Sequence, residues 1–226
     1  MNSQQARVVA VDGPSGTGKS TVSKRLATAL GAAYLDTGAM YRAATLAALR
    51  SGVDLTDAEA VTTAVHHAKL DFGTTPADPY SRLDGAPVDA EIRGPEVTKA
   101  VSAVAGIPAV RAHLIAEQRR IIAEAAGGIV VEGRDIGEVV APDADLKIYL
   151  TADERERARR RSAEDNSDIT ATAADLARRD AADAKTTKPH EAAPGAVILD
   201  TTGLGIEEVV DRMRELLDNS NGEASD

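Results

Sequence analysis

The sequence lacks cysteine and tryptophan entirely and has few aromatic residues of any kind. Its 226 residues include four tyrosines and one phenylalanine, so aromatic residues make up 2% of the chain. Without cysteine there can be no disulfide, no thiol nucleophile and no zinc site with Cys ligands. So few rings also argue against a surface on which nucleic-acid bases stack. The pair His66-His67 falls on a predicted helix, where we interpret it as a solvated face rather than a metal site.

Positive charge and long apolar runs are scarce as well. There are 26 Lys and Arg against 36 Asp and Glu, which gives a net charge of −10 and a sequence pI near 4.9. Non-specific nucleic-acid binding needs a basic surface, so we expect no nucleic-acid partner. No run approaches the ~18 apolar residues of a membrane helix. The first residues lack the positive region of a signal peptide. We therefore expect a soluble, cytoplasmic protein with no membrane partner.

The hydrophobic pattern predicts an α/β fold. Short Val- and Leu-rich runs with little alternation are typical of parallel strands that are covered on both faces, and longer amphipathic segments lie between them. The predicted strands are 7–12, 33–36, 129–132, 146–150 and 197–199, and the predicted helices are 19–30, 38–50, 54–69, 96–105, 108–126, 171–182 and 206–217. This alternation favours an open parallel sheet flanked by helices.

The alternation is interrupted in the first half of the chain. Residues 70–72 and 80–83 read as short strands, and Asp84-Gly85 is a hairpin signal. Thr151 to Glu154 matches a capping box that opens an arginine-rich helix, and the polar residues 162–169 suggest a loop. We expect a core formed by residues 1–37 and 112–218, an inserted domain at 38–111, and a polar, disordered tail at 219–226.

A glycine-rich segment directly follows the first predicted strand and fits the pattern G-x-x-x-x-G-K-[ST] completely. Small residues there allow backbone N–H groups to surround a phosphate, and the following helix adds its positive N-terminal dipole. Lys19 can reach the β- and γ-phosphates, and the Ser20 hydroxyl can bind Mg²⁺. The sequence therefore predicts a nucleoside triphosphate site with ATP and Mg²⁺ as cofactors, formed by Gly13, Pro14, Ser15, Gly16, Thr17, Gly18, Lys19, Ser20 and Thr21.

Arginines gather at the ends of the predicted elements in this acidic chain, which suggests a site for two anionic ligands. They are Arg42, Arg93, Arg111, Arg134 and Arg179, with a further group at Arg157, Arg159, Arg160 and Arg161 on one helix. Arg157 and Arg161 share a helix face, where like charges repel unless an anion joins them. The alternative is a solvated basic face paired with Glu154 and Glu156.

The segment GRDIG at 133–137 places an arginine and an aspartate side by side at a strand end. A planar guanidinium suits a phosphate, and a carboxylate can accept hydrogen bonds from a second ligand. The alternative is a structural ion pair between Arg134 and Asp135.

Four stretches give the sequence a resemblance to the bacterial cytidylate kinase (CMP kinase) family, which belongs to the nucleoside monophosphate kinases. They appear in the family's order and spacing, and the pattern I-R-x-x-E-V-x-x-x-x-S-x-V-A-x-x-P-x-V-R in the third is highly specific. The stretches are DGPSGTGKSTV at 12–22, LDTGAMYRA at 35–43, EIRGPEVTKAVSAVAGIPAVRA at 91–112 and EGRDIGE at 132–138.

The resemblance implies a P-loop NTPase fold with a central parallel sheet flanked by helices, an inserted monophosphate-binding domain at 38–111 and a short lid at about 157–170. It implies transfer of the γ-phosphoryl group of ATP to CMP or dCMP with Mg²⁺, without a catalytic base and in a monomer. The implied CMP site consists of Thr37, Arg42, Ser102, Arg111, Arg134, Asp135, Arg179 and Asp183. Among them, Arg42, Arg134 and Arg179 would hold the phosphate, Ser102, Arg111 and Asp135 the cytosine, and Asp183 the ribose. The implied catalytic residues are Lys19, Arg157 and Arg161.

The chain departs from the family pattern after Asp183. An arginine that the family uses for the CMP phosphate is absent there, and Lys185 or Lys188 is a candidate to replace it. Two other functions remain open from the residues alone. One is a P-loop kinase for another small acceptor such as shikimate or gluconate. The other is a nucleotide-binding switch without phosphoryl transfer.

Overall fold

The structure, a computed structural model, describes residues 7–165, 168–184, 187 and 191–219, and leaves the side chains of Glu164, Asp165 and Arg179 undescribed. Its central sheet has five strands in the order β2-β6-β1-β7-β8, and all neighbouring pairs are parallel. These strands are β1 (Val8–Asp12), β2 (Ala33–Asp36), β6 (Ile129–Glu132), β7 (Leu146–Thr151) and β8 (Val197–Asp200). The predicted parallel sheet is confirmed.

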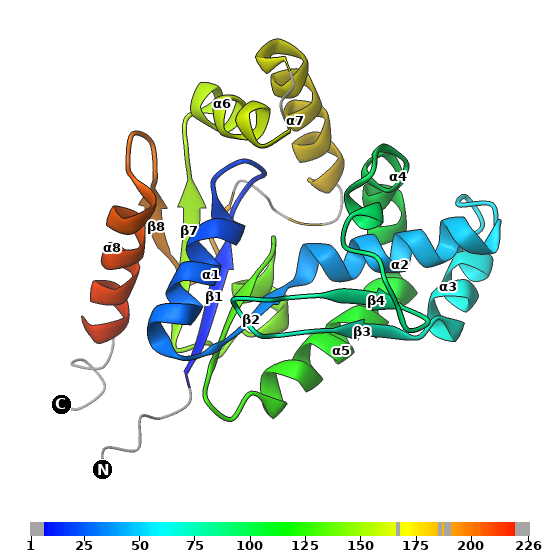
Figure 1. The fold of residues 1–226 in the computed structure, drawn as a ribbon, viewed down its shortest axis with the longest axis horizontal. Helices are drawn as coiled ribbons and strands as arrows, with labels where there is room; N and C mark the ends of the chain where they lie inside the picture. Colours follow the sequence, from blue (N-terminus) through cyan, green and yellow to red (C-terminus); the bar gives the residue numbers. More distant parts are fainter. Residues whose placement is uncertain (1–6, 166–167, 185–186, 188–190, 220–226) are drawn as a thin grey trace.

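A second, antiparallel sheet lies within the interrupted region, in the order β3-β4-β5. Its strands are β3 (Leu70–Phe72), β4 (Ser81–Leu83) and β5 (Ala86–Pro87). Asp84 and Gly85 join the last two with φ values of 52° and 83°, as the hairpin signal predicted. Figure 1 shows this sheet on the side of the molecule away from β8.

Helices cover both faces of the central sheet and surround the second sheet. They are α1 (Lys19–Leu30), α2 (Thr37–Ser51), α3 (Ala58–His67), α4 (Pro95–Ala105), α5 (Pro108–Glu124), α6 (Glu154–Asp165), α7 (Ile169–Asp183) and α8 (Ile206–Asn219), with the short helices η1 (Glu91–Arg93) and η2 (Ile136–Val140). In Figure 1, α6 and α7 stand beyond the carboxyl ends of the strands.

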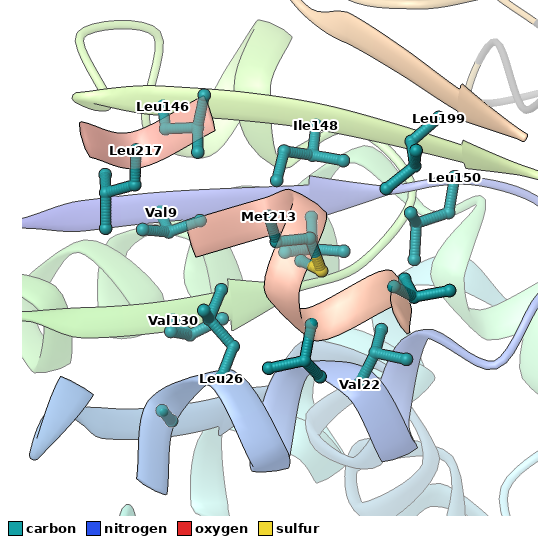
Figure 2. Packing of buried hydrophobic residues seen from close by; sticks show 14 of the residues in the cluster. Val9, Val22, Leu26, Val130, Leu146, Ile148, Leu150, Leu199, Met213 and Leu217 are labelled. Carbon is teal, nitrogen blue, oxygen red and sulfur yellow. The ribbon is translucent and has the colours of Figure 1, made fainter. Parts of the chain in front are cut away.

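The alternation of side chains along the strands divides the core into two layers. Val9 and Val11 of β1 point to one face and pack with helices α1 and α8, as Figure 2 shows around Leu26 and Met213. Ala10 points to the opposite face, where the packing residues come from α2, α5 and η2. A strand buried on both faces needs apolar residues at consecutive positions, which explains the unbroken apolar runs of the sequence.

Two local predictions are wrong around α6. Thr151 is not the helix cap, because it is the last residue of β7 and its carbonyl accepts a hydrogen bond from Thr201 N at 2.9 Å. Asp153 begins the turn instead, since its Oδ1 accepts from Arg155 N at 2.7 Å. The polar residues 162–165, predicted as loop, continue α6, and helix α7 begins at Ile169.

Among the described residues, no single helix is long and apolar enough to cross a membrane. Helices α4 and α5 reach that length and composition only when taken together, and the pair bends by 98° between them. His66 and His67 are exposed on α3, as predicted, and the ring of His66 lies 4.4 Å from that of His113. The tail predicted to be disordered lies outside the described residues, apart from Asn219.

Candidate active site

The glycine-rich loop joins β1 to α1 in the predicted strand–loop–helix order. Its glycines adopt positive φ values of 142° at Gly13, 79° at Gly16 and 89° at Gly18. A Cβ on Gly13 would lie 2.2 Å from the carbonyl oxygen of Leu150, and one on Gly16 would lie 2.9 Å from that of Arg157. The loop therefore needs glycine both for its backbone conformation and for its close approach to β7 and α6.

Lys19 is the first residue of α1, and its Nζ donates to the carbonyl of Pro14 at 2.8 Å across the loop. The residue before it, Gly18, gives the helix no side-chain cap. The first N–H groups of a helix need acceptors from outside the helix. This helix start is therefore suited to an anion, with the ammonium group of Lys19 beside it.

A cavity of about 190 Å³ opens beside the loop, at the carboxyl ends of β1, β2 and β6. Most of the residues predicted to form the site line it. They are Ser15, Gly16, Gly18, Lys19, Ser20, Thr21, Thr37, Arg42, Ser102, Arg111, Arg134, Asp135, Arg161 and Asp183. Residues far apart in the sequence are thus brought around one space, which is where open α/β sheets bind their ligands.

Some predicted residues do not line this cavity. Gly13, Pro14 and Thr17 belong to the loop but lie behind its surface, and Thr17 Oγ1 donates to the carbonyl of Pro14 at 3.1 Å. The side chain of Arg179 and the residues Lys185 and Lys188 lie outside what the structure describes. Their predicted contacts with a phosphate stay predictions.

Arg134 and Asp135 bind different partners. Arg134 donates from Nη1 to the carbonyl of Gly13 at 3.0 Å and approaches Asp183 Oδ2 with Nη2 at 2.9 Å. Asp135 accepts from Arg111 Nη2 at 2.5 Å. The alternative of an ion pair between the two neighbours is therefore wrong, because each charge is held by a group from another part of the fold.

Helices α2, α4 and α7 form one wall of the cavity. Ser102 Oγ donates to Asp183 Oδ1 at 3.0 Å and so links α4 to α7. Arg42 is only 6% exposed, and its Nη1 donates to the carbonyl of Ile92 at 3.0 Å and to Thr98 Oγ1 at 2.9 Å. The pKa of Arg42 is lowered to about 10, first by burial and then by the nearby charges of other arginines. The cavity is thus strongly cationic at this wall.

The arginines of α6 play two distinct structural roles. Arg161 lines the cavity. Arg157 is buried behind the loop, where Nη1 donates to Ser15 O at 3.0 Å and lies 2.6 Å from Asp180 Oδ2. The solvated-face alternative is wrong for Arg157 and right for Arg159, which is exposed and pairs with Glu156 at 2.8 Å. Helix α6 is therefore already docked on the glycine-rich loop.

Asp12 was not predicted as a site residue, yet it links the two loops of the cavity. It ends β1, and its carboxylate accepts from Ile136 N and from Gly137 N, each at 2.8 Å. Burial raises the pKa of Asp12 to about 6, while these two hydrogen bonds act in the opposite direction. These two hydrogen bonds fix the position of the GRDIG segment relative to the glycine-rich loop.

Glu132 is the second carboxylate that sequence reasoning missed. It is buried at the end of β6, where it accepts a short hydrogen bond from the Tyr34 hydroxyl. Burial raises the pKa of Glu132, and the charge of Asp36 raises it further. Hydrogen bonding to Ser20 acts in the opposite direction. A carboxylate that ends a predicted buried strand was the available signal for both Asp12 and Glu132.

These oxygens fit a magnesium ion that arrives with a nucleotide. The Ser20 hydroxyl and the carboxylates of Asp36 and Glu132 line the cavity beside Lys19, and hard oxygen ligands are those that Mg²⁺ prefers. Within the described ranges, no group of three or more His, Asp or Glu residues could hold a metal by itself. A magnesium ion at this place would depend on phosphate oxygens for further ligands.

Comparison with known proteins places the site in a family context. The family model described as cytidylate kinase matches residues 9–219. The cytidylate kinase of Rhodococcus opacus is 52% identical over 97% of this chain and 98% of the relative. That of Nocardia farcinica is 52% identical over 96% of each chain. A solved gluconokinase from Sinorhizobium meliloti covers 94% of this chain and 92% of its own, with 16% identity and a TM-score of 0.51, which shows a shared fold alone.

Proposed function

The chain belongs to the cytidylate kinase family, and we propose that it transfers the γ-phosphoryl group of ATP to CMP, and also to dCMP, with Mg²⁺. The observation that carries this proposal is the single cavity. It joins a phosphate-binding loop to a cationic wall that also presents the carboxylates of Asp135 and Asp183. A donor triphosphate and an acceptor monophosphate can therefore approach each other from opposite sides.

On the donor side, we assign the triphosphate to residues 13–21. The backbone N–H groups at the start of α1 would bind phosphate oxygens, and Lys19 would exchange the carbonyl of Pro14 for the β- and γ-phosphates. Ser20 would hold Mg²⁺, with Glu132 and Asp36 nearby. The ion supplies charge neutralisation between the β- and γ-phosphates when it is bound.

On the acceptor side, ion pairs within the protein occupy the groups assigned to CMP. Arg134 would exchange Asp183 for the CMP phosphate, joined by Arg42 and Arg179, and Thr37 lies at the same wall. Asp183 would then be available to the ribose hydroxyls. These exchanges replace one charged partner by another, so the buried arginines are never left unpaired.

For the base, we assign Ser102, Arg111 and Asp135. Asp135 is 12% exposed in its side chain and already accepts a hydrogen bond from Arg111 at 2.5 Å. A carboxylate in this position can accept a further bond from the amino group of cytosine. Uracil presents an oxygen at that place, which the carboxylate would repel.

Phosphoryl transfer in this class depends on positioning and on charge neutralisation, so we propose no catalytic base. Arg161 would contact the transferring group from the cavity wall, and Arg157 would act through its hold on the loop at Ser15. Both arginines belong to the lid that we propose at about 157–170. Its closure would exclude water that would otherwise hydrolyse ATP.

We also propose that residues 38–111 form an inserted CMP-binding domain on a core made by 1–37 and 112–218. The separate antiparallel sheet and two hydrophobic clusters between α2 and its neighbours support this division. A cytoplasmic monomer with no nucleic-acid or membrane partner completes the proposal, and the net charge of −10 supports the absence of a nucleic-acid partner.

A panel of acceptors tests the proposed function. With ATP and Mg²⁺, ADP formation should be fastest with CMP and dCMP, slower with UMP, and absent with AMP, shikimate and gluconate. Preference for shikimate or gluconate would identify a kinase for another acceptor. Nucleotide binding without activity on any acceptor would identify a switch, and either result would contradict the proposal.

A further inference from the structure

Arg93 lines the same cavity but has no role in the assignments above. It is the last residue of η1. Its Nη2 lies 3.3 Å from Asp36 Oδ2, and its side chain is 54% exposed. An ion pair as exposed as this one contributes little to stability.

The position of Arg93 relative to Arg42 is informative. The guanidinium of Arg42 is fixed by a hydrogen bond to the carbonyl of Ile92, the residue that directly precedes Arg93. After burial, the charge of Arg93 is the largest cause that lowers the pKa of Arg42, followed by that of Arg161. Like charges gathered in this way repel each other, and an anion between them removes the repulsion.

The charge of the cavity as a whole points in the same direction. Six basic side chains line it against four carboxylates, in a chain whose net charge is −10. A phosphate dianion would balance this local excess. Lys19 would face it from the loop, and the arginines of the opposite wall would face it from the other side.

The other arginines of that wall are more firmly held than Arg93. Arg42 donates to two acceptors, Arg111 is paired with Asp135 at 2.5 Å, and Arg134 donates to Gly13 O besides its contact with Asp183. Arg93 has the longest of these contacts and the most exposed side chain. Its guanidinium can therefore change partner at the lowest cost.

We propose that Arg93 is a phosphate-binding residue of the acceptor site, whose guanidinium exchanges the carboxylate of Asp36 for the acceptor phosphate and closes on it together with Arg42. This inference rests on the proposed function. It adds a cation from η1 to the arginines assigned to the acceptor phosphate. It does not depend on Lys185 or Lys188, which lie outside the described residues. It makes Asp36 the partner that holds Arg93 when the acceptor is absent.

The test is the substitution Arg93→Met, which keeps the length of the side chain and removes its charge. Loss of a hydrogen bond to a charged group should raise the KM for CMP by roughly 10- to 150-fold. The KM for ATP should stay within about twofold, because Arg93 lies on η1, outside the residues 13–21 that are assigned to the triphosphate. Arg93→Lys, which keeps the charge but loses the planar fork, should give an intermediate KM for CMP.

Arg50→Met is the matched control. Arg50 pairs with Glu91 at the other end of η1, at 2.5 Å, and lies outside the cavity. Its removal should leave the KM for CMP unchanged. An equal rise of the KM for CMP in both variants would mean that binding requires only that η1 is anchored. An equal rise of the KM for CMP and for ATP in Arg93→Met would mean that Arg93 acts through the overall charge of the cavity. Either result, or an unchanged KM for CMP in Arg93→Met, overturns the inference.

The proposed function is judged separately, on the unsubstituted protein. If the unsubstituted protein phosphorylates CMP and Arg93→Met has the same KM for CMP, the inference about Arg93 fails while the function stands. If the unsubstituted protein does not phosphorylate CMP, the function itself fails. Melting curves of all variants confirm that the comparison is made between folded proteins.

Discussion

Lys19→Ala should lower kcat for CMP phosphorylation by about 10²–10³-fold, the usual cost of removing one group that stabilises developing charge. Lys19 stands at the start of α1, and its Nζ donates to the carbonyl of Pro14 in the loop at 2.8 Å. It belongs to no hydrophobic cluster, so the melting temperature should change little. Initial rates at saturating ATP and CMP, with a melting curve of each protein, provide the measurement.

Lys147→Ala is the control for this substitution. The Nζ of Lys147 also donates to a proline carbonyl, that of Pro194, at 3.3 Å, but the residue lies on β7 away from the cavity. It should retain the rate of the unsubstituted protein. Transfer at a near-normal rate in Lys19→Ala would remove the assignment of the loop as the donor site.

Asp135→Ala and Arg134→Ala should separate recognition of the base from recognition of the phosphate. Every monophosphate offers Arg134 the same anion, so Arg134→Ala should weaken CMP and UMP alike, by roughly 10- to 150-fold. Asp135→Ala should weaken CMP by a similar factor but affect UMP little or even improve it, because only cytosine presents the amino group. The measurement is the ratio of kcat/KM for CMP to that for UMP, which should fall only in Asp135→Ala.

Glu117→Ala provides the control for loss of an acidic partner of arginine. Glu117 pairs with Arg120 at 2.5 Å on α5, outside the cavity, and its removal should leave the CMP-to-UMP ratio unchanged. If both cavity variants kept the original ratio, Asp135 would not read the base. Its bond to Arg111 would then be structural, and the cytosine assignment would lose its main support.

Much of this architecture could be predicted because it is encoded locally. Apolar runs without alternation gave the strands of the parallel sheet, and the glycine-rich loop could be placed because its pattern sits directly between a strand and a helix. The family motifs then named most of the residues that line the cavity.

The partners of charged side chains could not be predicted in the same way. Arg134 meets Asp183 of α7, and Asp135 meets Arg111 of α5, only because the fold brings the segment after β6 beside these two helices. The sequence shows Arg134 and Asp135 as neighbours, whereas the fold directs them to different elements. Asp12 was missed for the same reason, since the backbone N–H groups that donate to its carboxylate lie 124 and 125 residues further along the chain.

The errors around α6 have a local cause. Thr151 resembles a helix cap in sequence, but its backbone is used by the sheet, where it pairs with Asp200 of β8. Sheet pairing therefore excluded the capping conformation, and Asp153 took that role. Residues 162–165 are polar and were read as loop, yet polarity alone does not distinguish a loop from the exposed end of a helix.

The most direct test of the central claim follows the phosphoryl group itself. With ATP labelled at the γ-phosphate, CMP and Mg²⁺, the account predicts that the label appears in the β-phosphate of CDP, with little release of inorganic phosphate while CMP is present. Label found only in inorganic phosphate, at a rate that CMP does not change, would contradict the account, because the cavity would then bind a nucleotide without bringing donor and acceptor together.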